Sequence, residues 1–160
     1  SNNNNNSNNS NNSNNSNNEK EEAELFSAKV ETIIPIDEKI KNTAIYNIKI
    51  KSSLNCNDEW IKPYSLDELI NFRDYLLKYT HSVINLPFPT KSLFRFLPYF
   101  GQKYDERNWD ILLENKFLLD DFFKTICKDK EMYKLSGFVN FFAKPKPETT
   151  QRNSNIFFYN

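Results

Sequence analysis

The chain has 160 residues and carries equal numbers of basic and acidic side chains, 21 of each. This balance excludes a strong overall field that would draw the chain onto nucleic acid or anionic lipid, so any anion site has to be local. The two cysteines form no CxxC pair, which argues against a disulfide framework and favours a reducing, cytoplasmic location. No apolar run is long enough to cross a bilayer.

Composition divides the chain into four segments. Residues 1–18 consist only of Asn and Ser, a low-complexity tract that has no apolar side chain to bury and is expected to be disordered. An acidic linker follows over 19–25, and residues 26–142 have enough apolar mass for one domain. Residues 143–160 form a C-terminal linker or tail. Because the sequence starts with serine, we expect it to be part of a longer protein.

Three strands are expected first. Phe26 to Ile36 is rich in β-branched residues, and Pro35 is expected to mark its end. Ala44 to Lys51 alternates between apolar and polar residues with a period of two, which is typical of a half-buried strand. Glu59 to Tyr64 indicates a third, shorter strand. Three consecutive strands predict an antiparallel meander.

Helices follow the strands. Ser65 and the glutamate three residues later form a capping box, which predicts a helix that runs to about Tyr79. A second helix is expected to begin near Tyr104 and to carry apolar residues at helical spacing from Trp109 to Ile126. A last short helix is expected over Met132–Phe142. Strands followed by helices predict an α+β fold, with a small antiparallel sheet against a helical subdomain.

These elements occur in the order of a known family. An aromatic-rich strand that ends at Tyr64, a helix, a proline-rich loop from Leu86 to Lys91 and a helical tail together resemble the PX (phox homology) domain. The stretch from Lys91 to Gly101 looks like the same region of the small PX-only sorting nexins. The resemblance covers about Phe26 to Phe142. It implies a three-stranded antiparallel sheet packed on a helical subdomain, with the proline-rich loop beside it.

The resemblance also implies a function. Similar domains hold a phosphoinositide headgroup, commonly phosphatidylinositol 3-phosphate, between the sheet and the helices. Tyr64 matches the residue that stacks on the inositol ring, and Lys91 matches the residue that meets the 1-phosphate. We therefore expect a peripheral membrane adaptor of the sorting-nexin type, on endosomal membranes, with a role in protein transport and with protein partners in trafficking.

Two positions depart from the family. Pro63 stands where the family has a basic residue that grips the 3-phosphate, with Lys62 one position earlier. Asn115 aligns with an arginine that binds the ring hydroxyls, and Lys116 next to it is a second candidate. Proline has neither a charge nor a backbone N–H, and Asn has no charge. The sequence therefore predicts weak binding and poor preference for the 3-phosphate. The alternative is a module that keeps the fold for protein partners and has lost lipid recognition.

The residues after Lys91 are unusually apolar. Similar domains dip a loop at this place into the bilayer interface, and burial of such side chains would add to membrane affinity. The alternative is that several of them lie under the proline loop. The expected insertion residues are Leu93, Phe94, Phe96, Leu97, Tyr99 and Phe100.

Other classes of function find little support. His81 is the only histidine, and neither cysteine forms a recognisable pattern with it, so we expect no metal site and no nucleophilic dyad. The sequence has no P-loop and no GxGxxG motif, and we expect no cofactor. The absence of a basic stripe argues against nucleic-acid binding. We expect a binding module and not an enzyme.

Overall fold

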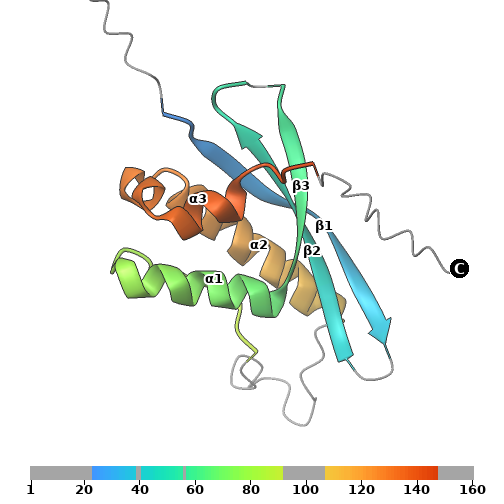
Figure 1. Ribbon diagram of the computed structural model, residues 1–160. Helices are drawn as coiled ribbons and strands as arrows, with labels where there is room; N and C mark the ends of the chain where they lie inside the picture. The colour runs from blue at the N-terminus through green and yellow to red at the C-terminus, as the bar shows by residue number, and fades with distance from the viewer. Residues whose placement is uncertain (1–22, 39–40, 56, 92–106, 148–160) are drawn as a thin grey trace, which may run out of the picture.

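The computed structural model describes residues 23–38, 41–55, 57–91 and 107–147. In this part of the chain the fold is α+β, with a three-stranded antiparallel sheet in the order β1-β2-β3 and the helices gathered on one side of it (Figure 1). The elements are β1 (Phe26–Glu38), β2 (Lys41–Ser52), β3 (Glu59–Ser65), α1 (Leu66–Tyr79), α2 (Trp109–Ile126), the 3₁₀ helix η2 (Lys130–Lys134) and α3 (Ser136–Phe142).

The three predicted strands are present, and the first is longer than predicted. Pro35 does not end β1 but pairs with Ala44 of β2, and the strand continues to Glu38. β1 is an edge strand, where a proline removes no hydrogen bond that the sheet needs. The register of β1 against β2 shifts between Val30 and Thr32, which leaves Glu31 as the extra residue of a β-bulge.

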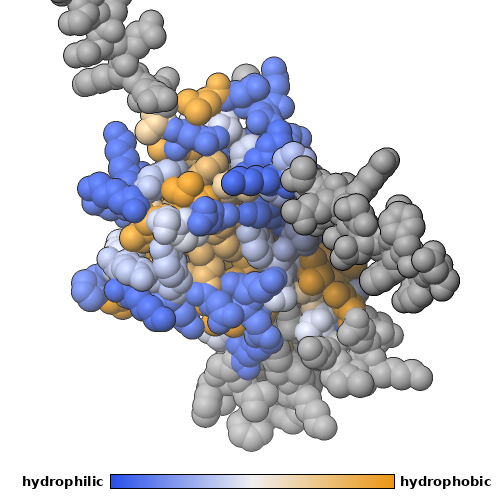
Figure 2. Space-filling view, in the orientation of Figure 1, coloured by the Kyte–Doolittle hydropathy of each residue, from blue (hydrophilic) through white to orange (hydrophobic). Residues whose placement is uncertain are grey.

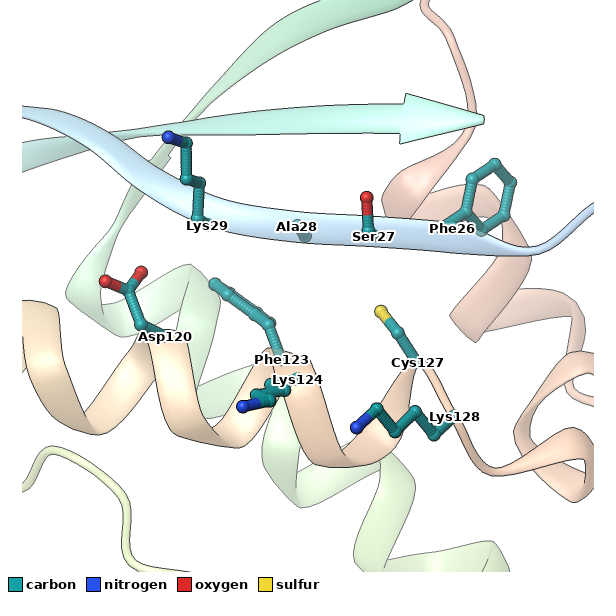
Figure 3. A pocket seen from close by; sticks show the side chains of 9 residues that line it. All are labelled: Phe26, Ser27, Ala28, Lys29, Asp120, Phe123, Lys124, Cys127 and Lys128. Atoms are coloured by element: carbon teal, nitrogen blue, oxygen red, sulfur yellow. The ribbon is translucent and has the colours of Figure 1, made fainter. Parts of the chain in front are cut away.

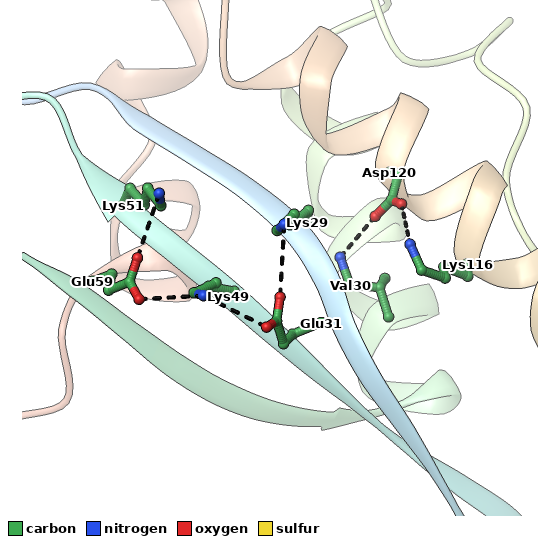
Figure 4. Close-up of polar contacts among 8 residues, drawn as sticks. All are labelled: Lys29, Val30, Glu31, Lys49, Lys51, Glu59, Lys116 and Asp120. Atoms are coloured by element: carbon green, nitrogen blue, oxygen red, sulfur yellow. Dashed lines mark hydrogen bonds and ion pairs between the residues drawn. The ribbon is translucent and has the colours of Figure 1, made fainter. Parts of the chain in front are cut away.

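The alternation in β2 divides its residues between two faces of the sheet. Tyr46, Ile48 and Ile50 are fully buried against the helices, as the period of two predicted. Lys49 and Lys51 point to the other face. There Lys49 lies 3.2 Å and Lys51 3.5 Å from the carboxylate of Glu59 on β3 (Figure 4). This part of the outer face of the sheet is therefore charged, although Ile61 of β3 is also half exposed there.

The helices begin largely where the capping signals placed them. The Ser65 side chain accepts a hydrogen bond from the Glu68 amide, and the Glu68 side chain accepts one from the Ser65 amide, so the capping box is confirmed. α2 begins at Trp109 after the N-cap Asn108, whereas Tyr104 lies outside the described residues. The predicted last helix is divided: η2 ends before Leu135, and α3 starts at Ser136.

Aromatic side chains dominate the core between the sheet and the helices. Phe72 of α1 stacks on Phe141 of α3 with ring centroids 3.7 Å apart, and Phe142 fills the space between Phe72 and Phe123 of α2. On the face shown in Figure 2, hydrophilic side chains predominate, and smaller apolar patches show among them. Among the described helices, none is both long and apolar enough to cross a bilayer.

The apolar spacing of α2 overstates how much of the helix is buried. Trp109 is 65% exposed and Phe117 is 59% exposed, whereas Leu112 and Leu119 are fully buried. An i, i+3, i+4 pattern marks residues that share a face, but it does not tell which of several apolar stripes faces the sheet.

Candidate functional site

The end of β3, the start of α1 and the proline loop come together in the structure. Lys91 closes the loop, and its ammonium group lies 2.8 Å from the carboxylate of Asp67 in the first turn of α1. Tyr64 is three residues before Asp67, at the end of β3. The loop therefore returns Lys91 to the first turn of α1, the helix that directly follows the strand carrying Tyr64.

The proline loop is held in place by Phe88. This side chain is buried, and its ring meets the ring of Phe122 on α2 edge to face, with centroids 4.8 Å apart. The guanidinium of Arg73 on α1 lies over the ring of Phe88, 5.6 Å from the ring centroid. An aromatic anchor of this kind fixes the loop between two helices and so limits where Lys91 can reach.

Tyr64 is already engaged with α3. Its hydroxyl donates a hydrogen bond to the backbone carbonyl of Phe141 at 2.6 Å, and its ring stacks on the Phe141 ring with centroids 4.3 Å apart. Burial, and after it the carboxylate of Glu68, raise the pKa of Tyr64 well above its usual value. The phenol is thus a neutral donor at physiological pH, and one face of its ring is covered.

Lys62 lies on the same face of β3 as Tyr64. Its ammonium group donates to the carbonyl of Asn140 at 3.0 Å and sits 5.8 Å above the Tyr64 ring. Burial lowers the pKa of Lys62. Pro63 lies between them, is exposed and pairs with Asn47 of β2. It points to the opposite face of the sheet, because successive residues of a strand point to opposite sides. An arginine at this position would therefore start from the outer face.

The two candidates on α2 have different environments. Asn115 is fully buried, and its side-chain amide donates to the hydroxyl of Tyr46 at 2.9 Å, while its oxygen Oδ1 has no partner among the described residues. Lys116 is partly exposed, and its ammonium group lies 2.8 Å from one carboxylate oxygen of Asp120. The second oxygen of Asp120 accepts a hydrogen bond from the Val30 amide (Figure 4). The structure thus places Asn115 in the core and Lys116 at the edge of β1.

The predicted insertion segment cannot be compared with the structure. Its residues, Leu93, Phe94, Phe96, Leu97, Tyr99 and Phe100, lie outside the described residues.

β3 also holds the end of α3, a role that the sequence analysis did not predict. Trp60, Lys62 and Tyr64 alternate along one face of the strand, and all three donate to consecutive carbonyls at the end of α3. The indole of Trp60 bonds the Phe142 carbonyl at 2.9 Å, next to the contacts of Lys62 and Tyr64. These donors satisfy carbonyls that a helix leaves without partners, and a cation suits the negative end of the helix. The period of two in the sequence was a signal for the shared face, but it did not indicate the partner.

The described residues offer few options for other ligands. No three His, Cys, Asp or Glu side chains in this part of the chain come close enough to hold a metal ion. The candidate cations each contact an oxygen: Lys91 an exposed carboxylate, Lys116 a partly buried one, and Lys62 a backbone carbonyl. Of these contacts, the one at Lys91 is the most open to exchange with an external anion. No family model matches the chain, and no curated protein matches it either.

Proposed function

We propose that this chain is a PX-like module that docks a protein on membranes and recognises a phosphoinositide headgroup weakly, with little preference for the 3-phosphate. Its place of action is the cytoplasmic face of endosomal membranes, as in the sorting nexins that the sequence resembles. The proposal rests on the order of the strands, the proline loop and the helices, and on the return of that loop to the end of β3.

One observation carries the proposal, namely the position of Lys91 at the first turn of α1. Its partner Asp67 is 69% exposed, and such surface ion pairs are worth only about 0–1 kcal/mol. The 1-phosphate of a phosphoinositide, which Lys91 is expected to meet, is a diester with one negative charge, so it competes with one carboxylate for the ammonium group on nearly equal terms. A phosphate monoester on the inositol ring adds about −1.5 to −2 charges nearby at neutral pH. Asp67 then acts as an internal competitor that keeps the affinity low.

The other candidate residues explain why recognition is weak. Lys62 and Tyr64 serve the end of α3, and Asn115 is bonded to Tyr46 inside the core. The contacts of Tyr64 and Asn115 satisfy polar groups that are at least partly buried, so they are not lost without some loss of stability, whereas the contact of Lys62 is exposed. Headgroup binding therefore depends on Lys91 far more than it would in a PX domain with a full set of basic residues.

Vesicle binding tests this proposal directly. The full chain is titrated with phosphatidylcholine vesicles that contain or lack phosphatidylinositol 3-phosphate. Lys91→Glu should abolish the difference between the two vesicles, and Asp67→Asn should increase it because the Asp67 carboxylate no longer competes for Lys91. The matched control is Lys144→Glu, which breaks an exposed pair with Asp58 of similar length, 2.7 Å, and should leave binding unchanged. Equal binding by Lys91→Glu and the unaltered chain would exclude the proposed site.

A second candidate function is the PX-like scaffold that binds proteins only. The observation that favours it is the stack of Tyr64 on Phe141, which leaves no more than one face of the Tyr64 ring for an inositol ring. On this hypothesis neither Lys91→Glu nor Asp67→Asn changes the binding of any vesicle. Pro63→Arg separates the two further: a gain in binding would show that an arginine here reaches a headgroup from the outer face of β3.

A further inference from the structure

A groove lies between the first residues of β1 and the C-terminal half of α2. It encloses about 310 Å³, which is at the small end of ligand pockets. Phe26 and Ala28 line it from β1, and Phe123 and Cys127 point toward them from α2 (Figure 3). The base of the groove is therefore apolar, and none of these residues belongs to the candidate headgroup site.

The backbone of β1 is open at one point in this groove. The amides of Phe26 and Val30 point away from β2, because they donate to the Tyr133 hydroxyl at 2.9 Å and to Asp120 at 2.7 Å. In an antiparallel ladder every second residue points the same way, so the N–H and C=O of Ala28 also face away from β2. No group in the described part of the chain bonds them there. An open N–H and C=O on an edge strand are a template for another strand.

The rim of the groove is basic. Lys124 lies in the last turn of α2 and Lys128 two residues beyond its end, and neither has a partner among the described residues. The one acid that lines the groove, Asp120, is already neutralised by Lys116 and bonded to the Val30 amide. The charge that remains at the rim is positive, which suits an anionic occupant.

We propose that this groove binds a short, extended peptide segment in which acidic and apolar residues alternate. Its backbone pairs with Ala28, an apolar side chain contacts Phe26 and Phe123, and carboxylates meet Lys124 and Lys128. A peptide fits better than a simple anion because Ala28 presents a donor and an acceptor side by side, which is how one strand recognises another. The contacts of Tyr133 and Asp120 limit the pairing to this one residue, so the binding is short and weak.

Amide NMR on the full chain tests the proposal. The probe is a synthetic peptide of alternating glutamate and valine, compared with one of alternating lysine and valine and with inorganic phosphate. The acidic peptide should shift the Ala28 amide resonance and slow its hydrogen exchange, and the basic peptide should bind about tenfold or more weakly. If phosphate produces the same shifts at Lys124 and Lys128 while the peptide leaves the Ala28 amide unaffected, the site is a simple anion site and the proposal is wrong.

Two variants locate the site. Changing both Lys124 and Lys128 to glutamate should reverse the preference, so that the basic peptide binds better than the acidic one. The matched control changes two other exposed lysines, Lys78 and Lys130, in the same way and should keep the original preference. Ala28→Pro removes the outward N–H without removing a bond to β2 and should weaken the acidic peptide about tenfold. If that variant does not fold, the proposal is tested by the hydrogen exchange of the Ala28 amide in the unaltered chain, which the acidic peptide should slow.

Discussion

Asn115 is the residue whose environment differs most from the role suggested by the resemblance. A side chain that is fully buried and bonded to Tyr46 cannot also reach ring hydroxyls at the surface. Its second polar atom, Oδ1, remains without a partner, and such an atom is destabilising by about 1–3 kcal/mol. The residue is therefore better understood as a polar position inside the core than as a weakened ligand.

Asn115→Arg tests this interpretation. An arginine here would bury a charge without a carboxylate partner, which lowers the free energy of unfolding by about 3–5 kcal/mol. We expect a clear fall in Tm and no gain in vesicle binding. Asn115→Leu is the control, because it removes the unpartnered oxygen together with the donor and should change stability by less than about 1.5 kcal/mol. A stable Asn115→Arg variant with stronger lipid binding would show that this side chain reaches the surface after all.

Local sequence patterns predicted those features of the fold that depend only on neighbouring residues. The capping box of Ser65 and the alternation of β2 act over a few positions, so the elements they start or form could be inferred from the sequence. The environment of Asn115 depends on Tyr46, which is 69 positions away, and no periodicity carries that information. The contact between Lys91 and Asp67 in the first turn of α1 likewise had no local signal in the sequence.

At the scale of elements, the short helix α3 depends on its neighbours. An isolated helix of 7 residues is too short to be stable, and α3 lacks a side-chain N-cap bond. Its C-terminal carbonyls are satisfied by Trp60, Lys62 and Tyr64 of β3. The amide of Gly137 at its other end donates to the hydroxyl of Tyr75 on α1 at 3.0 Å. α3 is thus bonded at both ends to elements that precede it by more than 60 positions.

Tyr64→Phe measures the C-terminal contact. The change keeps the ring on Phe141 and removes the hydrogen bond to its carbonyl, so the free energy of unfolding should fall by about 0.5–1.5 kcal/mol in a urea titration. Tyr79→Phe is the matched control, since that tyrosine is 62% exposed, and it should leave the midpoint unchanged. Equal midpoints for both variants would show that the bond from Tyr64 contributes nothing.

Gly137→Ala tests the packing of α3 against α1. A Cβ at this position would clash with the ring of Tyr75, so the tyrosine would have to move and release the Gly137 amide. We expect a loss of about 1–3 kcal/mol in the free energy of unfolding. In a Tyr75→Ala background the same change should be neutral or stabilising, because alanine favours a helix over glycine. A full loss in both backgrounds would exclude the ring as the cause.

At the scale of the whole molecule, the sheet separates two environments. On its outer face, carboxylates and lysines from all three strands alternate: Glu31 pairs with Lys49, and Lys49 with Glu59 (Figure 4). These groups are solvated, and salt weakens their contacts. On the inner face, the helices bury weak acids that stay neutral. Burial raises the pKa of Cys127 to about 12, and it also raises the pKa of Tyr64 and Tyr133.

These buried acids predict that the fold loses stability in alkali. In each case the pKa in the folded state is above the ordinary value, 9.0 for the thiol and 10.0 for the phenols, so the unfolded chain releases protons first. Stability from these groups is complete below pH 9 and falls as the pH rises toward 12. For one group the slope is about −1.4 kcal/mol per pH unit. Lys62 acts in the opposite direction, because burial lowers its pKa.

Urea titrations between pH 8 and pH 11 measure this slope, with a reducing agent present to keep the thiol free. Cys127→Ala should be less stable than the unaltered chain at pH 8, because it leaves a small cavity in the core. Its stability should then fall less steeply above pH 9, by up to about 1.4 kcal/mol per pH unit, since the unfolded variant has no thiol at position 127 to ionise. Parallel curves for the two proteins would mean that the Cys127 thiol titrates alike in the folded and unfolded chain, and that the tyrosines alone account for any alkaline loss.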